Sequence, residues 1–126
     1  MILLDTDILI EIFDKSSNKG DEALKKIEEE GEGDVVITAL NLHELLYGLH
    51  KYASPEKINK VLILDTLGFE KGDAALSARL EAESEKKGKK LSRMDSMIAA
   101  VAINKSLKLF TYNKKHYQDI EGLELF

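Results

Sequence analysis

Residues 1–7 read Met-Ile-Leu-Leu-Asp-Thr-Asp, an apolar run that stops at a pair of acids. Four consecutive apolar residues predict a short strand that is buried on both faces, as strands of parallel sheets are. Asp5 then stands at the carboxyl end of that strand. Because ligands of parallel α/β sheets bind beyond the carboxyl ends of the strands, Asp5 is the first candidate for a functional site.

The rest of the chain alternates short aliphatic runs with longer amphipathic ones. We expect further strands at residues 35–38, 64–67, 107–110 and 123–126. Helices are expected at residues 8–13, 21–30, 42–52, from Pro55 onward, at 70–87 and at 95–105. Gly88 would end the helix at 70–87, which has Ala74, Ala75, Ala78, Leu80 and Ala82 available for close packing. Strands that alternate with helices predict an α/β fold with a mainly parallel sheet, covered by helices on both faces.

The composition is that of a globular chain, with 44% hydrophobic and 33% charged residues among 126, and we expect one domain over residues 1–126. No apolar run approaches the roughly 18 residues that a membrane-spanning helix needs. The apolar start lacks a basic leader and meets Asp5 at once, so we expect a strand and no signal peptide. The absence of cysteine excludes disulfides and thiolate metal sites, which fits a cytoplasmic protein.

The net charge of −5 argues against a broad surface for nucleic acid. One basic strip without acids, residues 86–93, nevertheless precedes Asp95. Lys89, Lys90 and Arg93 are candidates there for contacts to the phosphates of a polyanion. The alternative is a solvated helix end whose lysines complement the helix dipole.

Three acids, Asp5, Glu44 and Asp95, follow or open apolar segments at positions that could share one end of the sheet. Glu44 and Asp95 are each flanked by apolar residues and should lie near the buried side of their helices, where a lone charge is costly. Converging carboxylates repel one another unless a cation neutralises them, and oxygen-only ligand sets suit Mg²⁺ or Mn²⁺. The pattern therefore favours a metal-dependent hydrolase.

Each acid also has an ordinary alternative. Asp5 could cap the first helix, since Asp is a preferred N-cap residue. Asn41 with Glu44, and Ser92 with Asp95, have the spacing of a capping box. Capping stabilises a helix by about 0.5–2 kcal/mol at each site and requires no metal.

Thr111 and Asn113 follow the strand at 107–110 and should reach the same end of the sheet. Asn113 can offer an oxygen to a hard cation, and the Thr111 hydroxyl can hold a neighbouring carboxylate. Asn113 could equally mark a turn. His116 is expected on the surface.

Taken together, residues 1–7, Thr38 with residues 44–48, residues 95–102 and residues 111–113 resemble the PIN domain, and more narrowly the VapC-type toxins. The resemblance implies a three-layer α/β/α fold around a sheet of four to five strands, with a Mg²⁺- or Mn²⁺-dependent endoribonuclease centre. Asp5, Glu44 and Asp95 match the family's acidic positions. The chain departs from the family where many members carry a fourth aspartate, near Asn113 and His116, which puts a second metal ion in doubt.

The resemblance also implies an RNA substrate, a VapB-type antitoxin partner and a homodimer, with no membrane attachment. Asn113 would join the three acids in catalysis, and Thr6 and Thr111 would support them. Several apolar residues could line an antitoxin groove or a dimer interface, although the core is the favoured alternative for most: Leu9, Ile10, Phe13, Leu45, Leu46 and Leu49.

Two other functions remain open from the sequence. Asp5-Thr6-Asp7 after an apolar strand also resembles the signature of haloacid-dehalogenase-type phosphohydrolases, with Asp5 as nucleophile and Asp7 as acid and base. In the PIN interpretation, Asp7 would instead cap the first helix. A non-catalytic binding module, in which all the acids are caps, is the third hypothesis.

Overall fold

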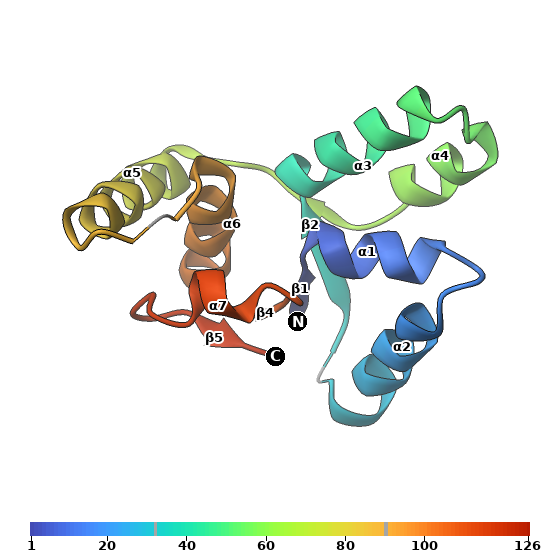
Figure 1. The fold of residues 1–126 in the computed structure, drawn as a ribbon, viewed down its shortest axis with the longest axis horizontal. Coiled ribbons are helices and arrows are strands. Elements are labelled where there is room, and N and C mark those ends of the chain that lie inside the picture. Colours follow the sequence, from blue (N-terminus) through green and yellow to red (C-terminus); the bar gives the residue numbers. More distant parts are fainter. Residues whose placement is uncertain (32, 90) are drawn as a thin grey trace.

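The structure of the chain, a computed structural model, describes residues 1–31, 33–89 and 91–126. At its centre is a five-stranded sheet with the order β3-β2-β1-β4-β5, in which every pairing is parallel (Figure 1). The strands are β1 (Ile2–Leu4), β2 (Val35–Thr38), β3 (Thr66–Leu67), β4 (Lys108–Phe110) and β5 (Glu124–Leu125). All five lie where the apolar runs predicted strands.

Helices cover both faces of this sheet, so the predicted three-layer α/β/α architecture is confirmed (Figure 1). One side carries α1 (Thr6–Phe13), α2 (Asn18–Glu30), α3 (Ala39–Lys51) and α4 (Pro55–Leu62). The other carries α5 (Lys71–Lys86), α6 (Arg93–Asn104) and the short α7 (Lys114–Tyr117). Sequence analysis did not predict α7.

The alternation of side chains along the strands divides the interior into two cores. Ile2 and Leu4 of β1 point into a core formed with α1 to α4, whereas Leu3 between them points into a core formed with α6 and α7. All three are at most 3% exposed. A strand buried on both faces must be apolar at every position, which explains the uninterrupted run at the start of the chain.

The helix α5 packs differently from expectation. Its buried residues are Asp73 and Ser77, while the alanines expected on its inner face are exposed: Ala74, Ala75, Ala78 and Ala82. Asp73 is 3% exposed and accepts a hydrogen bond from Asn104 Nδ2 of α6 at 2.8 Å. Leu80, also expected to pack, lies on the same helical face as Asp73 and Ser77 and contacts the core. The expectation was therefore right for Leu80 and wrong for these four alanines. Gly88, with φ of +71°, ends the segment as predicted.

Strand order reverses beside β1, which is where open α/β sheets bind ligands. The chain moves from β1 through β2 to β3 on one side, and then returns to place β4 and β5 on the other. Leu4 pairs with Phe110, so the residues that follow, Asp5 and Thr111, leave two adjacent strands at the same edge. Among the described residues, no helix is long and apolar enough to cross a bilayer.

Candidate active site

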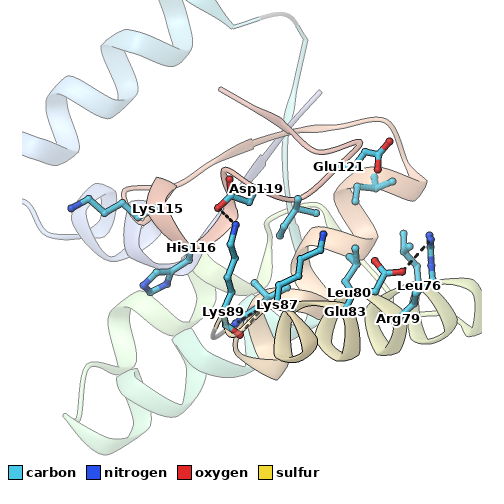
Figure 2. Close-up of a pocket in the computed structure, with 14 residues that line it drawn as sticks. Leu76, Arg79, Leu80, Glu83, Lys87, Lys89, Lys115, His116, Asp119 and Glu121 are labelled. Atoms are coloured by element: carbon cyan, nitrogen blue, oxygen red, sulfur yellow. Dashed lines mark hydrogen bonds and ion pairs between the residues drawn. The ribbon is translucent and has the colours of Figure 1, made fainter.

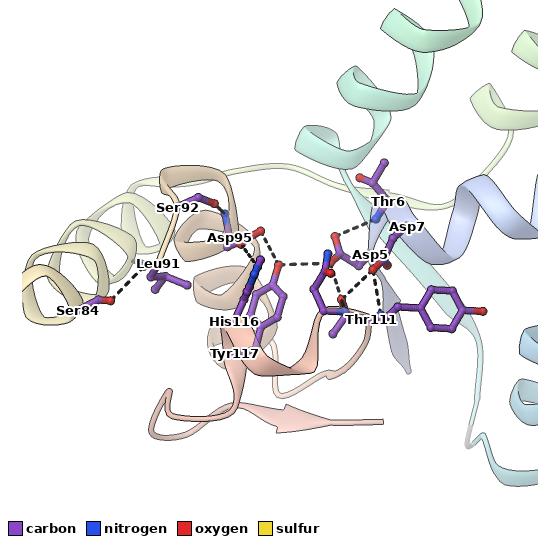
Figure 3. A network of polar contacts seen from close by, with 12 residues as sticks. Asp5, Thr6, Asp7, Ser84, Leu91, Ser92, Asp95, Thr111, His116 and Tyr117 are labelled. Carbon is purple, nitrogen blue, oxygen red and sulfur yellow. Dashed lines mark hydrogen bonds and ion pairs between the residues drawn. The ribbon is translucent and has the colours of Figure 1, made fainter. Parts of the chain in front are cut away.

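Asp5 lies at the carboxyl end of β1 and is only 6% exposed. It is the N-cap of α1, since its Oδ1 accepts a hydrogen bond from the backbone N of Thr6 at 2.8 Å. Its other oxygen, Oδ2, accepts from Thr111 Oγ1 at 2.8 Å and from the Tyr117 hydroxyl at 3.3 Å (Figure 3). The capping alternative is thus confirmed, but one cap bond occupies only part of this carboxylate.

Burial raises the pKa of the Asp5 carboxyl above its ordinary value. The hydrogen bonds from Thr111 and Thr6 oppose that rise, and the negative charge of Asp95 adds to it. Two carboxylates therefore sense each other's charge in this site. Such mutual repulsion is what a bound cation would relieve.

Asp95 reaches the same place from the first turn of α6, where Ser92 is the N-cap and accepts from the backbone N of Asp95 at 3.0 Å. The Asp95 side chain is 22% exposed. Its Oδ1 accepts from the Tyr117 hydroxyl at 2.9 Å, and its Oδ2 lies 3.3 Å from Nδ1 of His116 (Figure 3). One tyrosine hydroxyl therefore touches both Asp5 and Asp95, which come from distant parts of the chain.

Glu44 is half-buried on α3 and accepts from the Thr6 hydroxyl at 2.8 Å. The predicted capping box of Asn41 with Glu44 is wrong: the box joins Thr38 with Asn41, one turn earlier. Asn41 is fully buried, and its Nδ2 donates to Thr6 at 3.0 Å and lies 3.5 Å from Asp5 Oδ1. Glu44 is thus linked to Asp5 through Thr6 and Asn41.

Asp7 joins this cluster instead of capping α1, so its predicted role as the cap is wrong. Its Oδ2 accepts from the backbone N of Tyr112 at 3.0 Å and from Thr111 Oγ1 at 3.4 Å. Its Oδ1 is buried and, among the described residues, has no hydrogen-bond partner. Burial, followed by the charge of Asp5, raises the pKa of Asp7.

Asn113 and His116 lie at the surface beside the acids. Asn113 is exposed at the start of α7, and its backbone N donates to Thr111 Oγ1 at 3.0 Å. Thr111 is buried, with 1% of it exposed. Its hydroxyl donates to Asp5 and accepts from the backbone N of Asn113 at the start of α7, so it contacts both. His116 is exposed, as expected, yet it contacts Asp95 directly.

The donor atoms suit a hard divalent cation in their chemistry, because carboxylate, hydroxyl and amide oxygens gather at one edge. Within the described residues, no lysine or arginine forms an ion pair with Asp5, Asp7 or Glu44. In the same part of the chain, no three histidine or acidic side chains stand in a metal-binding arrangement. Asp5 and Asp95 meet at Tyr117, and within the described residues Glu44 joins them through Thr6, so the three-carboxylate shell around one cation stays a prediction.

The basic residues next to Asp95 are already engaged. Arg93 forms a bidentate pair with Glu81, with both N–O distances 3.1 Å, and Lys89 pairs with Asp119 at 2.6 Å. Lys90 lies outside the described residues. A phosphate would have to compete with these acids for Arg93 and Lys89. The Lys89–Asp119 pair is exposed on both sides and therefore weak, whereas Arg93 is held by two hydrogen bonds to Glu81, whose side chain is only 19% exposed.

A cavity of about 640 Å³ is lined by residues of α5, of α7 and of the segments that follow them (Figure 2). Basic side chains on its lining include Arg79, Lys87, Lys89 and Lys115, and acids are interspersed among them. His116, the neighbour of Asp95, also lines it. The cavity therefore includes Lys87 and Lys89 of the basic strip, and His116 is its link to Asp95.

Comparison with known proteins identifies the family. The PIN domain matches residues 2–122 of the 126. The chain belongs to the PIN domain family. The haloacid-dehalogenase alternative is set aside, because the match spans nearly the whole chain and includes every candidate site residue.

Two relatives and one solved structure illustrate the similarity. The tRNA(fMet)-specific endonuclease VapC of Shigella flexneri is 28% identical over 97 residues, which cover 73% of this chain and 74% of the relative. Ribonuclease VapC1 of Methanocaldococcus jannaschii is 27% identical over 129 residues, covering 99% and 86%. The structure of VapBC2 from Rickettsia felis bound to a promoter DNA fragment has a chain with a TM-score of 0.81 and 26% identity, with 100% and 98% covered.

Sequence reasoning missed two side chains of this PIN domain site, Tyr117 and Asn41. Tyr117 lies four residues after Asn113 and is carried inward by the unpredicted helix α7. An aromatic residue here would be expected to pack in the core. Nothing in the sequence indicates that its hydroxyl contacts two acids. Asn41 carried a clearer signal, because Thr38 and Asn41 have capping-box spacing at the end of a predicted strand.

Proposed function

We propose that this PIN domain is a Mg²⁺- or Mn²⁺-dependent endoribonuclease, the toxin of a VapBC-type pair. One observation carries the proposal: Asp5 and Asp95 contact a single hydroxyl at the carboxyl edge of the sheet, and Glu44 is tied to the same cluster. The names of the similar proteins, an endonuclease VapC and a ribonuclease VapC1, support the reaction class.

In this proposal Asp5, Glu44 and Asp95 hold the cation, with Thr6 and Thr111 orienting the carboxylates. The cation would make a water molecule a stronger nucleophile and would offset negative charge on the reacting phosphodiester. Asp95 and Glu44, both half-buried, face the substrate side, whereas the buried Asp5 anchors the site. The exposed Asn113 amide can orient the attacking water.

The RNA substrate would lie along the cavity lined by His116, the neighbour of Asp95. Lys89 and Arg93 would contact phosphates on either side of the cleaved bond, exchanging their partners Asp119 and Glu81 for the RNA. The same role is proposed for Lys90. Because the chain is acidic overall, this contact would be local and would weaken as salt is added.

The test is cleavage of a mixed RNA pool by the wild-type protein with Mn²⁺ or with EDTA, and by the Asp95→Asn variant with Mn²⁺. We expect cleavage only for the wild type with Mn²⁺, and a rate at least about 100-fold lower for Asp95→Asn. Asp65→Asn is the matched control, since Asp65 is exposed and precedes β3, an edge strand that β2 separates from β1. It should cleave like the wild type.

Cleavage that persists in EDTA would contradict the cation's role, and undiminished cleavage by Asp95→Asn would contradict the assigned site. A folded wild-type protein that neither cleaves RNA nor binds Mn²⁺ would instead support the non-catalytic module. These outcomes distinguish a wrong role for the cation, a wrong assignment of Asp95 and a protein without ribonuclease activity.

The proposed antitoxin partner is a VapB-type protein, as in the solved complex of the similar Rickettsia felis protein. Of the apolar residues considered for its groove, Leu9 and Leu45 are core residues and Phe13, Leu46 and Leu49 pack against the core. Ile10, 55% exposed on α1, is the remaining candidate. Ile10→Asp should weaken binding of the VapB-type protein in a pull-down.

The proposed homodimer is tested by sedimentation of the chain alone.

A further inference from the structure

The Tyr117 hydroxyl occupies a singular position in the described part of the site, because it lies within hydrogen-bonding distance of two carboxylates. It is 2.9 Å from Asp95 Oδ1 and 3.3 Å from Asp5 Oδ2 (Figure 3). A phenol carries one proton and can donate to only one acceptor at a time. Rotation of the hydroxyl about its C–O bond would move the donated hydrogen bond from one acid to the other without movement of the ring.

The ring itself is fixed by packing. Tyr117 is 1% exposed and belongs to the core that includes Ile98, Ala99 and Leu109. Close packing of this kind leaves a buried aromatic ring little freedom. The hydroxyl oxygen is therefore a fixed point, and the carboxylates orient around it.

Asp5 and Asp95 differ in how much else restrains them. Asp5 Oδ1 and Oδ2 also have Thr6 N, Asn41 Nδ2 and Thr111 Oγ1 within 3.5 Å, so groups from α1, from α3 and from the residue after β4 hold this acid in place. Asp95 is partly exposed, and its other side-chain contact is the exposed His116. Without Tyr117, repulsion from Asp5 would favour rotation of Asp95 toward solvent.

We propose that Tyr117 is a positioning residue of the catalytic centre, whose hydroxyl holds Asp95 beside Asp5 so that both carboxylates bind one divalent cation. This inference rests on the proposed function. It assigns the site a polar group that reaches both acids from within the core, whereas the exposed Asn113 and His116 stand at its rim.

The test is calorimetric titration of the metal-free protein with Mn²⁺, comparing wild type, Tyr117→Phe and Tyr112→Phe. Phenylalanine keeps the ring in the core and removes only the hydroxyl. We expect Tyr117→Phe to weaken Mn²⁺ binding about 10- to 100-fold, as loss of groups that orient metal ligands does. Tyr112→Phe is the matched control, because the Tyr112 hydroxyl contacts Lys19 O and neither acid; its Mn²⁺ affinity should equal that of the wild type.

RNA cleavage provides a second measurement. At saturating Mn²⁺ the KM of Tyr117→Phe for RNA should stay at the wild-type value, because the buried ring cannot contact the substrate. At subsaturating Mn²⁺ its kcat should fall in proportion to the lost metal occupancy. A purely structural role for Tyr117 would leave Mn²⁺ affinity unchanged.

A double-mutant cycle tests the contact without metal. In EDTA, the effects of Tyr117→Phe and Asp95→Asn on urea unfolding should be non-additive, since the residues share a hydrogen bond. Additive effects, or Mn²⁺ binding by Tyr117→Phe as tight as in the wild type or tighter, would overturn the inference while leaving the ribonuclease proposal intact. A wild type that neither binds Mn²⁺ nor cleaves RNA would overturn both.

Discussion

Asp5 and Asp7 stand two residues apart at the end of β1, and burial raises the pKa of both. A carboxyl whose pKa is higher in the folded chain favours folding while it is protonated. That contribution is complete below the ordinary aspartate pKa and is lost as the pH rises through the folded-state value. At neutral pH without metal, the charged cluster therefore costs stability.

Asp7→Asn should consequently raise the free energy of unfolding at pH 7 in EDTA, and the gain should shrink as the pH falls toward 4. Asp14→Asn should behave in the opposite way, because hydrogen bonds from Ser16 lower the pKa of Asp14. That stabilisation is present above the ordinary pKa and is lost as the pH falls. Urea unfolding at several pH values measures both, and equal profiles for the two variants would contradict the assigned signs.

Asn41 is a second residue whose environment predicts a measurable effect. Its amide is fully buried, accepts from Thr38 and donates toward Thr6. Asn41→Ala leaves these partners unsatisfied and should lower the free energy of unfolding by about 1–3 kcal/mol. The exposed Asn59→Ala in α4 is the control and should change it by less than about 0.5 kcal/mol. An equal decrease of the free energy of unfolding in both variants would contradict the stabilising role of the buried Asn41 amide.

Among the elements, α1 and α2 pack so closely that only glycine fits between them. A Cβ on Gly20 would lie 2.1 Å from the backbone O of Glu11. Gly20→Ala should destabilise the protein by about 1–3 kcal/mol through overpacking, although alanine is the better helix former. Gly72→Ala in α5 should be neutral or stabilising, since its nearest new contact is 3.9 Å away. Thermal unfolding of the two variants checks the sign, and stabilisation by Gly20→Ala would refute the close packing.

The apolar pattern of the sequence predicts some of these elements correctly and others not. The strands β1, β2 and β4 are buried apolar runs, and their position follows directly from the sequence. The inner face of α5 follows only in part, because Leu80 packs against the core as expected while Asp73, buried against Asn104, takes a place that the alanines were expected to fill. The helix α7 was missed because its four residues, Lys114–Tyr117, are too few for a helical period to appear.

On the scale of the whole molecule, cation binding should appear as stabilisation. A cation that binds only the folded state raises the free energy of unfolding by about 2.7 kcal/mol at 100 times its Kd. We therefore expect Mn²⁺ to raise the Tm of the wild type and to leave that of Asp95→Asn nearly unchanged. Equal shifts in the two proteins would indicate that the ion binds elsewhere. The Asp65→Asn variant, changed beside the edge strand β3, should shift as the wild type does.

The sequence by itself determined the succession of strands and helices along this PIN domain, apart from α7, and it singled out Asp5, Glu44 and Asp95. Apolar runs and acids at their ends are local features, so they can be read along the chain. Only the tertiary structure brought Tyr117 between Asp5 and Asp95, tied Glu44 to Thr6 and drew Asp7 into the cluster. These contacts join residues that lie from 22 to 112 positions apart, with Thr6 and Glu44 separated by 38. Side-chain hydrogen bonds over such separations depend on how the strands pair and how the helices pack, which no local pattern specifies.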